Sequence, residues 1–233
     1  MHSDDEGLTW DFDRWVMTGF EPSLTKHYNP SGDCKIGQQD DIIKVGCGDF
    51  SIYVEPDGEY IYLFYSKVSI DVSSNDVCAW TSCDACVARC LKRTDGTMGD
   101  FVKYYDGSFC EAGNLGRETP IMKDCWHPRV VYSEPMGLYI MSSKPIIAAV
   151  KGRISGLDHQ FKVAQFCVSK DLLHWSEPKI FYTDGIPFGN HYNAIISDDK
   201  NCPPNILKTN EFSMLCNHNG SLVERIKAKF VEI

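Results

Sequence analysis

Four acidic residues stand where a carboxylate could act on a ligand. Asp49 lies at the start of a predicted strand, in the sequence Gly-Asp-Phe, and Asp124 lies just before another predicted strand. Glu111 and Glu118 lie in the connection between these strands, where partial burial can raise the pKa of a glutamate and make it a proton donor. One carboxylate that accepts a proton and one that donates it suffice for acid–base chemistry. Capping of a strand, for Asp49, or exposure in a loop, for the glutamates, is the structural alternative.

A second group of polar and aromatic residues begins with the run WHPR at 126–129, which opens a predicted strand. Side chains alternate along a strand, so His127 and Arg129 can share one face and bind hydroxyls or a carboxylate. An aromatic ring can stack on the apolar face of a sugar. The predicted binding residues, grouped around Asp49, are Trp126, His127, Arg129, His191 and Tyr192.

Alternation of apolar and polar residues predicts a β-hairpin from Gly46 to Ser66, with its turn at Pro56–Glu59. The same plan returns from His127 to Ser142, with the turn at Glu134–Gly137, and more weakly from His191 to Cys216. Further strands are predicted at Trp15–Met17, Ser82–Arg93, Gly99–Tyr105, Phe161–Ser169, Lys179–Tyr182 and Leu222–Val231. No segment has an amphipathic helical period, so the chain is predicted to be all-β.

Composition limits the classes of partner. The chain of 233 residues is long enough for one sizeable core, and its formal charge of -9 argues against a nucleic-acid backbone as the main partner. No run of about 18 apolar residues is present, so no membrane insertion is predicted. The first ten residues show no signal-peptide pattern, which is expected of a cytoplasmic protein or of a secreted one whose leader is absent. The sequence requires no cofactor, and no metal site is predicted.

The cysteines number eleven, so they cannot all pair within a monomer. The densest group comprises Cys78, Cys83, Cys86 and Cys90, in which only Cys83 and Cys86 have the two-residue spacing typical of a zinc-binding pair. Free thiols that fill a tight interface are the favoured interpretation. A zinc site and a cysteine nucleophile acting with His127 stay open as alternatives.

Several segments match patterns of a known superfamily. They are GDFSIYVEPDGEYIYLFYS, VARCLKRTDG with FVKYYDGSF, and SKDLLHWSEPKIFY. Together they resemble the five-bladed β-propeller glycoside hydrolases of the arabinanase, xylosidase and invertase type. Ser3–Trp10, SDDEGLTW, resembles the Asp box of sialidase-type propellers, a turn between the outer strands of a blade. The resemblance implies a single propeller domain over residues 1–233, with four-stranded antiparallel blades, beginning within a blade and incomplete in this sequence.

The resemblance also implies an activity. In these families carboxylates at the entrances of the innermost strands cleave a glycosidic bond, one protonating the leaving oxygen and one activating water or attacking the sugar. Asp49 matches the inner-strand acid and is expected to be the base or nucleophile. Glu118 resembles a family Glu that precedes Pro, and Glu111 and Asp124 are further candidates. The expected function is hydrolysis of an oligo- or polysaccharide.

One departure from the family pattern leaves other functions open. Where the family commonly has Asp-Pro at the second inner strand, this chain has His127-Pro128. A propeller that binds a glycan or a protein without cutting it is one alternative. A glycoside phosphorylase, in which His127 and Arg129 hold phosphate, is another. Two carboxylates within roughly 5–10 Å of each other would favour hydrolysis, and Asp49 alone would favour binding.

Overall fold

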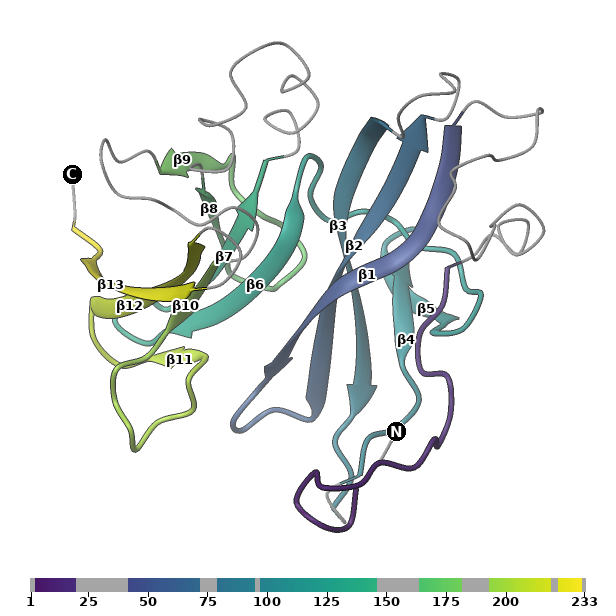
Figure 1. Cartoon of the computed structure of the whole chain (residues 1–233), viewed down its shortest axis with the longest axis horizontal. Helices are drawn as coiled ribbons and strands as arrows, with labels where there is room; N and C mark the ends of the chain where they lie inside the picture. Colours follow the sequence, from purple (N-terminus) through teal and green to yellow (C-terminus); the bar gives the residue numbers. More distant parts are fainter. Residues whose placement is uncertain are drawn as a thin grey trace.

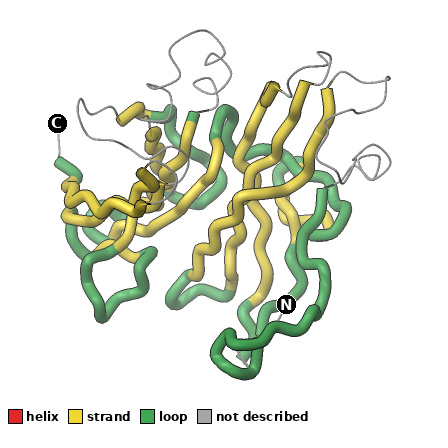
Figure 2. Tube along the Cα trace, in the orientation of Figure 1, coloured by secondary structure: helices red, strands yellow, loops and turns green. Residues whose placement is uncertain are grey.

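The structure is a computed structural model that describes residues 3–19, 42–71, 79–94, 97–145, 164–181, 193–218 and 222–231. Every helix or strand assigned in these ranges is a β-strand, so the predicted all-β class is confirmed (Figure 2). The strands form three sheets, which are antiparallel apart from one short parallel pair. Within the same ranges, no helix has the length and apolar character needed to cross a membrane.

The first sheet is a meander in which each strand pairs with the next one along the chain (Figure 1). Its strands are β1 (Ile42–Val54), β2 (Tyr60–Asp71), β3 (Ala79–Leu91), β4 (Val102–Tyr105) and β5 (Ser108–Ala112). The predicted first hairpin is confirmed, because β1 and β2 pair on either side of the turn, with Val54 opposite Ile61. Their register shifts between Gly48 and Ser51, which places an irregularity of the strand at Asp49.

The second and third sheets contain the rest of the strands. The second sheet comprises β6 (Trp126–Ser133), β7 (Leu138–Lys144), β8 (Ala164–Ser169) and β9 (Lys179–Phe181), with β11 (Ile206–Leu207) parallel to β6. The third sheet comprises β10 (Asn193–Ile196), β12 (Glu211–His218) and β13 (Leu222–Lys229). The second predicted hairpin is confirmed by the pairing of β6 with β7, and the weaker third one by the pairing of β10 with β12.

The sheets pack one after another across Figure 1, with apolar layers between them. Phe64 and Val130 belong to the layer between the first and second sheets, and Ile140 and Phe212 to the layer between the second and third. Tyr65 lies on the other face of β2 and is also fully buried. A strand buried on both faces is apolar at consecutive positions, which accounts for the run YLFY in β2.

The short strand predicted at Trp15–Met17 is wrong, because this segment carries no strand pairing. It is held instead by isolated hydrogen bonds to the loop after β5, from Thr18 N to Gly113 O and from Asn114 Nδ2 to Trp15 O. Isolated hydrogen bonds to a loop do not form the continuous pairing that defines a β-strand. Met17 is nevertheless buried in the apolar layer on the outer face of the first sheet.

Two Ser-x-Asp turns share one pattern of hydrogen bonds. In the first, Ser3 Oγ donates to Asp5 Oδ1 at 2.8 Å and the Trp10 indole donates to Gly7 O at 3.0 Å. In the second, between β8 and β9, Ser169 Oγ donates to Asp171 Oδ1 at 3.0 Å and the Trp175 indole donates to Leu172 O at 3.2 Å. The turn predicted at Ser3–Trp10 is therefore present, although the Trp10 side chain is 57% exposed.

Cys83, Cys86 and Cys90 are free thiols. Cys83, Cys86 and Cys90 are buried in the packing of β3, as expected for thiols that fill a tight interface, and Cys78 lies outside the described residues. Desolvation raises the pKa of all three thiols. The buried sulfur atoms therefore serve as small apolar groups.

Candidate functional site

The candidate site lies where the irregular part of β1 meets the start of β6. Asp49 has a left-handed backbone, with φ of 54°, and its half-buried carboxylate accepts a hydrogen bond from the Trp126 indole at 3.0 Å. The other carboxylate oxygen lies 3.2 Å from Nδ1 of His127, an ion-pair distance if the imidazole is protonated. Asp49 thus contacts two aromatic side chains of the neighbouring sheet.

Trp126 and His127 are adjacent in sequence, and in a regular strand they would point to opposite faces. The register of β6 with β7 shifts between Trp126 and Arg129, and His127 has φ of 56°. The two rings consequently stack, with centroids 4.5 Å apart and planes 19° apart. The predicted alternation of His127 and Arg129 is therefore interrupted, because the irregularity turns both Trp126 and His127 toward Asp49.

Backbone and hydroxyl groups hold this arrangement in place. Ser66 Oγ of β2 accepts a hydrogen bond from His127 N at 3.2 Å. Ser51 Oγ donates to the carbonyl of Pro128 at 2.6 Å, and Arg129 Nη1 donates to the carbonyl of Phe50 at 2.7 Å. These bonds join β1 and β2 to β6 on both sides of Asp49. The His127 side chain is only 3% exposed, so its ring is set by packing rather than by solvent.

The Asp49 carboxylate is held in its charged form. Partial burial by itself would raise the pKa of Asp49, but the contacts with His127 and Trp126, together with the charge of Arg129, outweigh it and lower this pKa. A charged carboxylate offers only acceptor oxygens. The arrangement can therefore accept hydrogen bonds from the hydroxyl groups of a ligand or act as a base.

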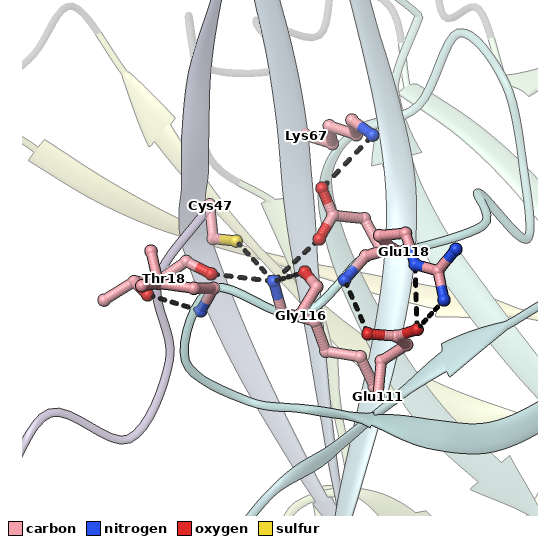
Figure 3. Close-up of polar contacts among 9 residues, drawn as sticks. Thr18, Cys47, Lys67, Glu111, Gly116 and Glu118 are labelled. Carbon is pink, nitrogen blue, oxygen red and sulfur yellow. Dashed lines mark hydrogen bonds and ion pairs between the residues drawn. The ribbon is translucent and has the colours of Figure 1, made fainter. Parts of the chain in front are cut away.

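Glu118 lies beside Lys67 of β2 (Figure 3). Its carboxylate is 3% exposed and forms ion pairs with Lys103 at 2.7 Å and with Lys67 at 3.1 Å. Lys67 follows Ser66 along β2, so the two side chains point to opposite faces of the strand. Ser66 contacts His127, whereas Lys67 contacts Glu118. The first sheet thus separates Glu118 from Asp49.

Glu111, the third candidate carboxylate, has its partner in the loop after β5. Glu111 binds Arg117, with Nε of the guanidinium 2.8 Å from Oε1. This hydrogen bond is the largest of the effects that lower the pKa of Glu111, so the expectation of a raised pKa is wrong for this residue. Asp124 lies beside Asp84, whose carboxylate accepts a hydrogen bond from Asp124 N at 3.2 Å.

The predicted site residues therefore fall into separate groups. Asp49, Trp126 and His127 come together, and Arg129 joins them through the backbone of Phe50. Glu118 belongs to the other face, and Glu111, in β5, binds Arg117 of the loop that follows. His191 and Tyr192 lie outside the described residues.

Three important residues were not predicted. Ser66, Lys67 and Lys103 are bonded to His127 or Glu118, and Ser66 and Lys103 are fully buried. Lys103 could have been found from the sequence. Alternation places it on the same face of its strand as Phe101 and Tyr105. A lysine within an apolar face indicates a buried partner of opposite charge.

Comparisons with known proteins leave the family open. No family model matches the chain, and no curated protein matches it. Among solved structures, the chain is similar to an N-acetylgalactosamine deacetylase from F. plautii, solved in complex with blood group B trisaccharide. The TM-score is 0.47 at 11% identity, and the match covers 87% of this chain and 53% of that chain. The chain thus spans about half the length of that protein, and a likeness of this degree settles neither fold nor activity.

Proposed function

We propose that the chain binds a carbohydrate at the site formed by Asp49, Trp126 and His127. The observation that carries this proposal is the meeting of two left-handed residues, Asp49 and His127, across two sheets, with Trp126 stacked beside them. Left-handed backbone at a residue other than glycine is costly and is concentrated at functional sites. The strain here turns one carboxylate and two rings toward the same point.

The chemistry of this group suits a sugar. A charged carboxylate accepts hydrogen bonds from hydroxyl groups, and an indole offers a flat apolar surface to the C–H face of a sugar ring. The half-buried setting of Asp49 limits competition from water without removing access. Within the described residues, Glu118 is held on the other face of the sheet, which favours binding over cleavage by a carboxylate pair.

Glycoside hydrolysis is the second candidate, favoured by the lowered pKa of Asp49. A base or nucleophile must be deprotonated at working pH, and Asp49 meets this condition. The acid partner would then have to come from a residue other than Glu118 or Glu111, or from a glutamate that moves on binding. Asp49 is the residue common to both candidates.

For the architecture, we propose that the three sheets are blades of one β-propeller domain over residues 1–233. Two observations support this. Each of the first two sheets is a meander of at least four strands, and neighbouring sheets share apolar layers. The Ser169–Trp175 turn joins the third and fourth strands of its sheet, and Ser3–Trp10 repeats its hydrogen bonds. A crystal structure in which the sheets form one stack without ring closure would contradict the proposal.

The test is a glycan array combined with an assay for released sugar, using the wild type and Asp49→Asn. The matched control is Asp106→Asn, because Asp106 is exposed and also left-handed, with φ of 46°. We expect the wild type and the control to bind the same glycans, and Asp49→Asn to lose about tenfold or more of the affinity, as for a charged hydrogen-bonding group.

The outcomes separate the two candidates. Release of sugar by the wild type, with an Asp49→Asn variant that binds but does not cut, identifies a hydrolase. Binding without release that depends on Asp49 identifies a recognition site. Equal binding by all three proteins, without release, would show that Asp49 serves the fold alone.

A further inference from the structure

A groove of about 840 Å³ lies at the end of the first sheet, where the β1–β2 turn meets the end of β3. Three cationic side chains line it, Arg89, Lys92 and Arg93, together with the rings of Tyr60 and Phe109. None of these residues belongs to the Asp49 site. The groove is notable because the chain as a whole carries a formal charge of -9.

Arg89 is held by aromatic rings rather than by a carboxylate. Its guanidinium carbon lies 3.9 Å from the centroid of the Tyr60 ring and 4.2 Å from that of Phe109. Such contacts hold a guanidinium group by its faces and leave its N–H edges for hydrogen bonds. These two ring contacts order the Arg89 side chain before any ligand arrives.

Carboxylates border the groove as well as cations, and the charges of Lys92 and Arg89 act on the nearby Glu55 carboxylate. Glu59 and Asp100 line the groove, and Asp100 lies 3.6 Å from Arg14 in an ion pair. Among the ion pairs between described residues, none involves Arg89 or Arg93. Arg89 and Arg93 therefore have no carboxylate within ion-pair distance among the described residues.

Lys92 forms hydrogen bonds with backbone carbonyls, which do not neutralise its positive charge. Its Nζ donates to the carbonyls of Glu55, at 2.6 Å, and Pro56, at 3.3 Å, which ties the end of β3 to the β1–β2 turn. Carbonyl groups are neutral, so the ammonium charge still contributes to the potential of the groove. Lys92 is expected to attract an anion by its charge, while part of its hydrogen-bonding capacity stays with the two carbonyls.

We propose that this groove binds an oxyanion, the sulfate or phosphate group of a ligand, through the guanidinium of Arg89 with the support of Arg93 and Lys92. The planar fork of a guanidinium group matches two oxygens of a sulfate or phosphate. The site is separate from the carbohydrate site and does not depend on it.

The probes are sodium sulfate and, separately, sodium phosphate, titrated at constant ionic strength maintained with sodium chloride. Binding is followed by the NMR shift of the arginine side-chain Nε–H groups. We expect a saturable shift of the Arg89 signal in the wild type. Arg93→Gln is expected to weaken binding by about threefold or more, as for loss of one charge contact. Arg89→Lys, which keeps the charge and loses the fork, is expected to weaken it further.

The control is Lys170→Gln, which removes an exposed cation outside the groove and should leave binding unchanged. Arg93 is itself exposed, so Arg93→Gln tests the groove without depending on a folded Arg89 variant. A shift that rises linearly with salt, or that is equal in the wild type and Arg93→Gln, would overturn the proposal. Saturation by only one of the two anions supports it and identifies the group that is bound.

Discussion

Asp49 and Glu118 are carboxylates on the two faces of the same sheet, and they are held by different kinds of contact. Asp49 is half-buried, and two aromatic rings from the neighbouring sheet contact it. Glu118 is almost fully buried between two lysines. The first arrangement stores backbone strain and leaves a charged group accessible, whereas the second satisfies its charges within the protein. Burial and charge alone therefore do not distinguish a ligand site from a structural ion pair.

Removal of the Glu118 charge should have the largest effect on stability. Glu118→Gln leaves Lys103, which is fully buried, without its anionic partner. The expected loss is about 3 kcal/mol or more in the free energy of unfolding, measured by urea denaturation. Glu111→Gln is the control, because it removes the carboxylate of an exposed ion pair and should change stability little. Equal losses of stability in both variants would mean that burial of the ion pair does not determine its contribution to stability.

A double-mutant cycle then sharpens the structural interpretation of this ion pair. Lys103→Met combined with Glu118→Leu removes both charges, so neither is left alone in the apolar layer. The double variant should lose less stability than the sum of the two single variants, by about 1–3 kcal/mol. Additive losses would indicate that Lys103 acts mainly through the carbonyls of Thr18 and Gly116, to which it also donates.

On the Asp49 face, Ser66→Ala tests the support of His127. The serine hydroxyl accepts the hydrogen bond of His127 N, and both residues are buried. Loss of the hydroxyl leaves a buried N–H group without this partner, with an expected cost of roughly 1–2 kcal/mol. Ligand binding should weaken in parallel, because the His127 ring loses one of its anchors. Unchanged stability and unchanged binding together would remove Ser66 from the site.

The smallest effect is the dependence of stability on pH at Asp49. Its pKa is lowered in the folded protein, so its stabilising contribution is present above the ordinary aspartate pKa of about 3.9 and is lost as pH falls through the native value. The stability of the wild type relative to Asp49→Asn should therefore decrease below about pH 4. Urea denaturation of both proteins between about pH 3 and 6 measures this difference. A constant difference over that range would contradict the contacts assigned to Asp49.

Most of the strands could be predicted from the sequence, because alternation and turn residues are local properties. The hairpins around Pro56–Glu59 and Glu134–Gly137 are where the pattern places them. The strand predicted at Trp15–Met17 is absent because strand formation also depends on a partner, which is not a local property. A three-residue apolar run becomes a strand only if a partner strand is beside it, and here the neighbouring chain is a loop.

The sequence by itself determined the all-β class and the presence of Trp126 and His127 at the start of a strand. Asp49 was predicted at the start of a strand as well, but β1 begins at Ile42 and Asp49 lies at the irregularity within it. Only the tertiary structure decided which side chains meet. Left-handed residues at Asp49 and His127 bring Trp126 and His127 onto one carboxylate, and regular alternation could not have indicated this. The face on which Glu118 lies depends on its pairing with Lys67 and Lys103, residues distant in sequence. The local alternation of residues determines where the strands form. The packing of the sheets and the shifts in strand register determine which side chains meet at the site.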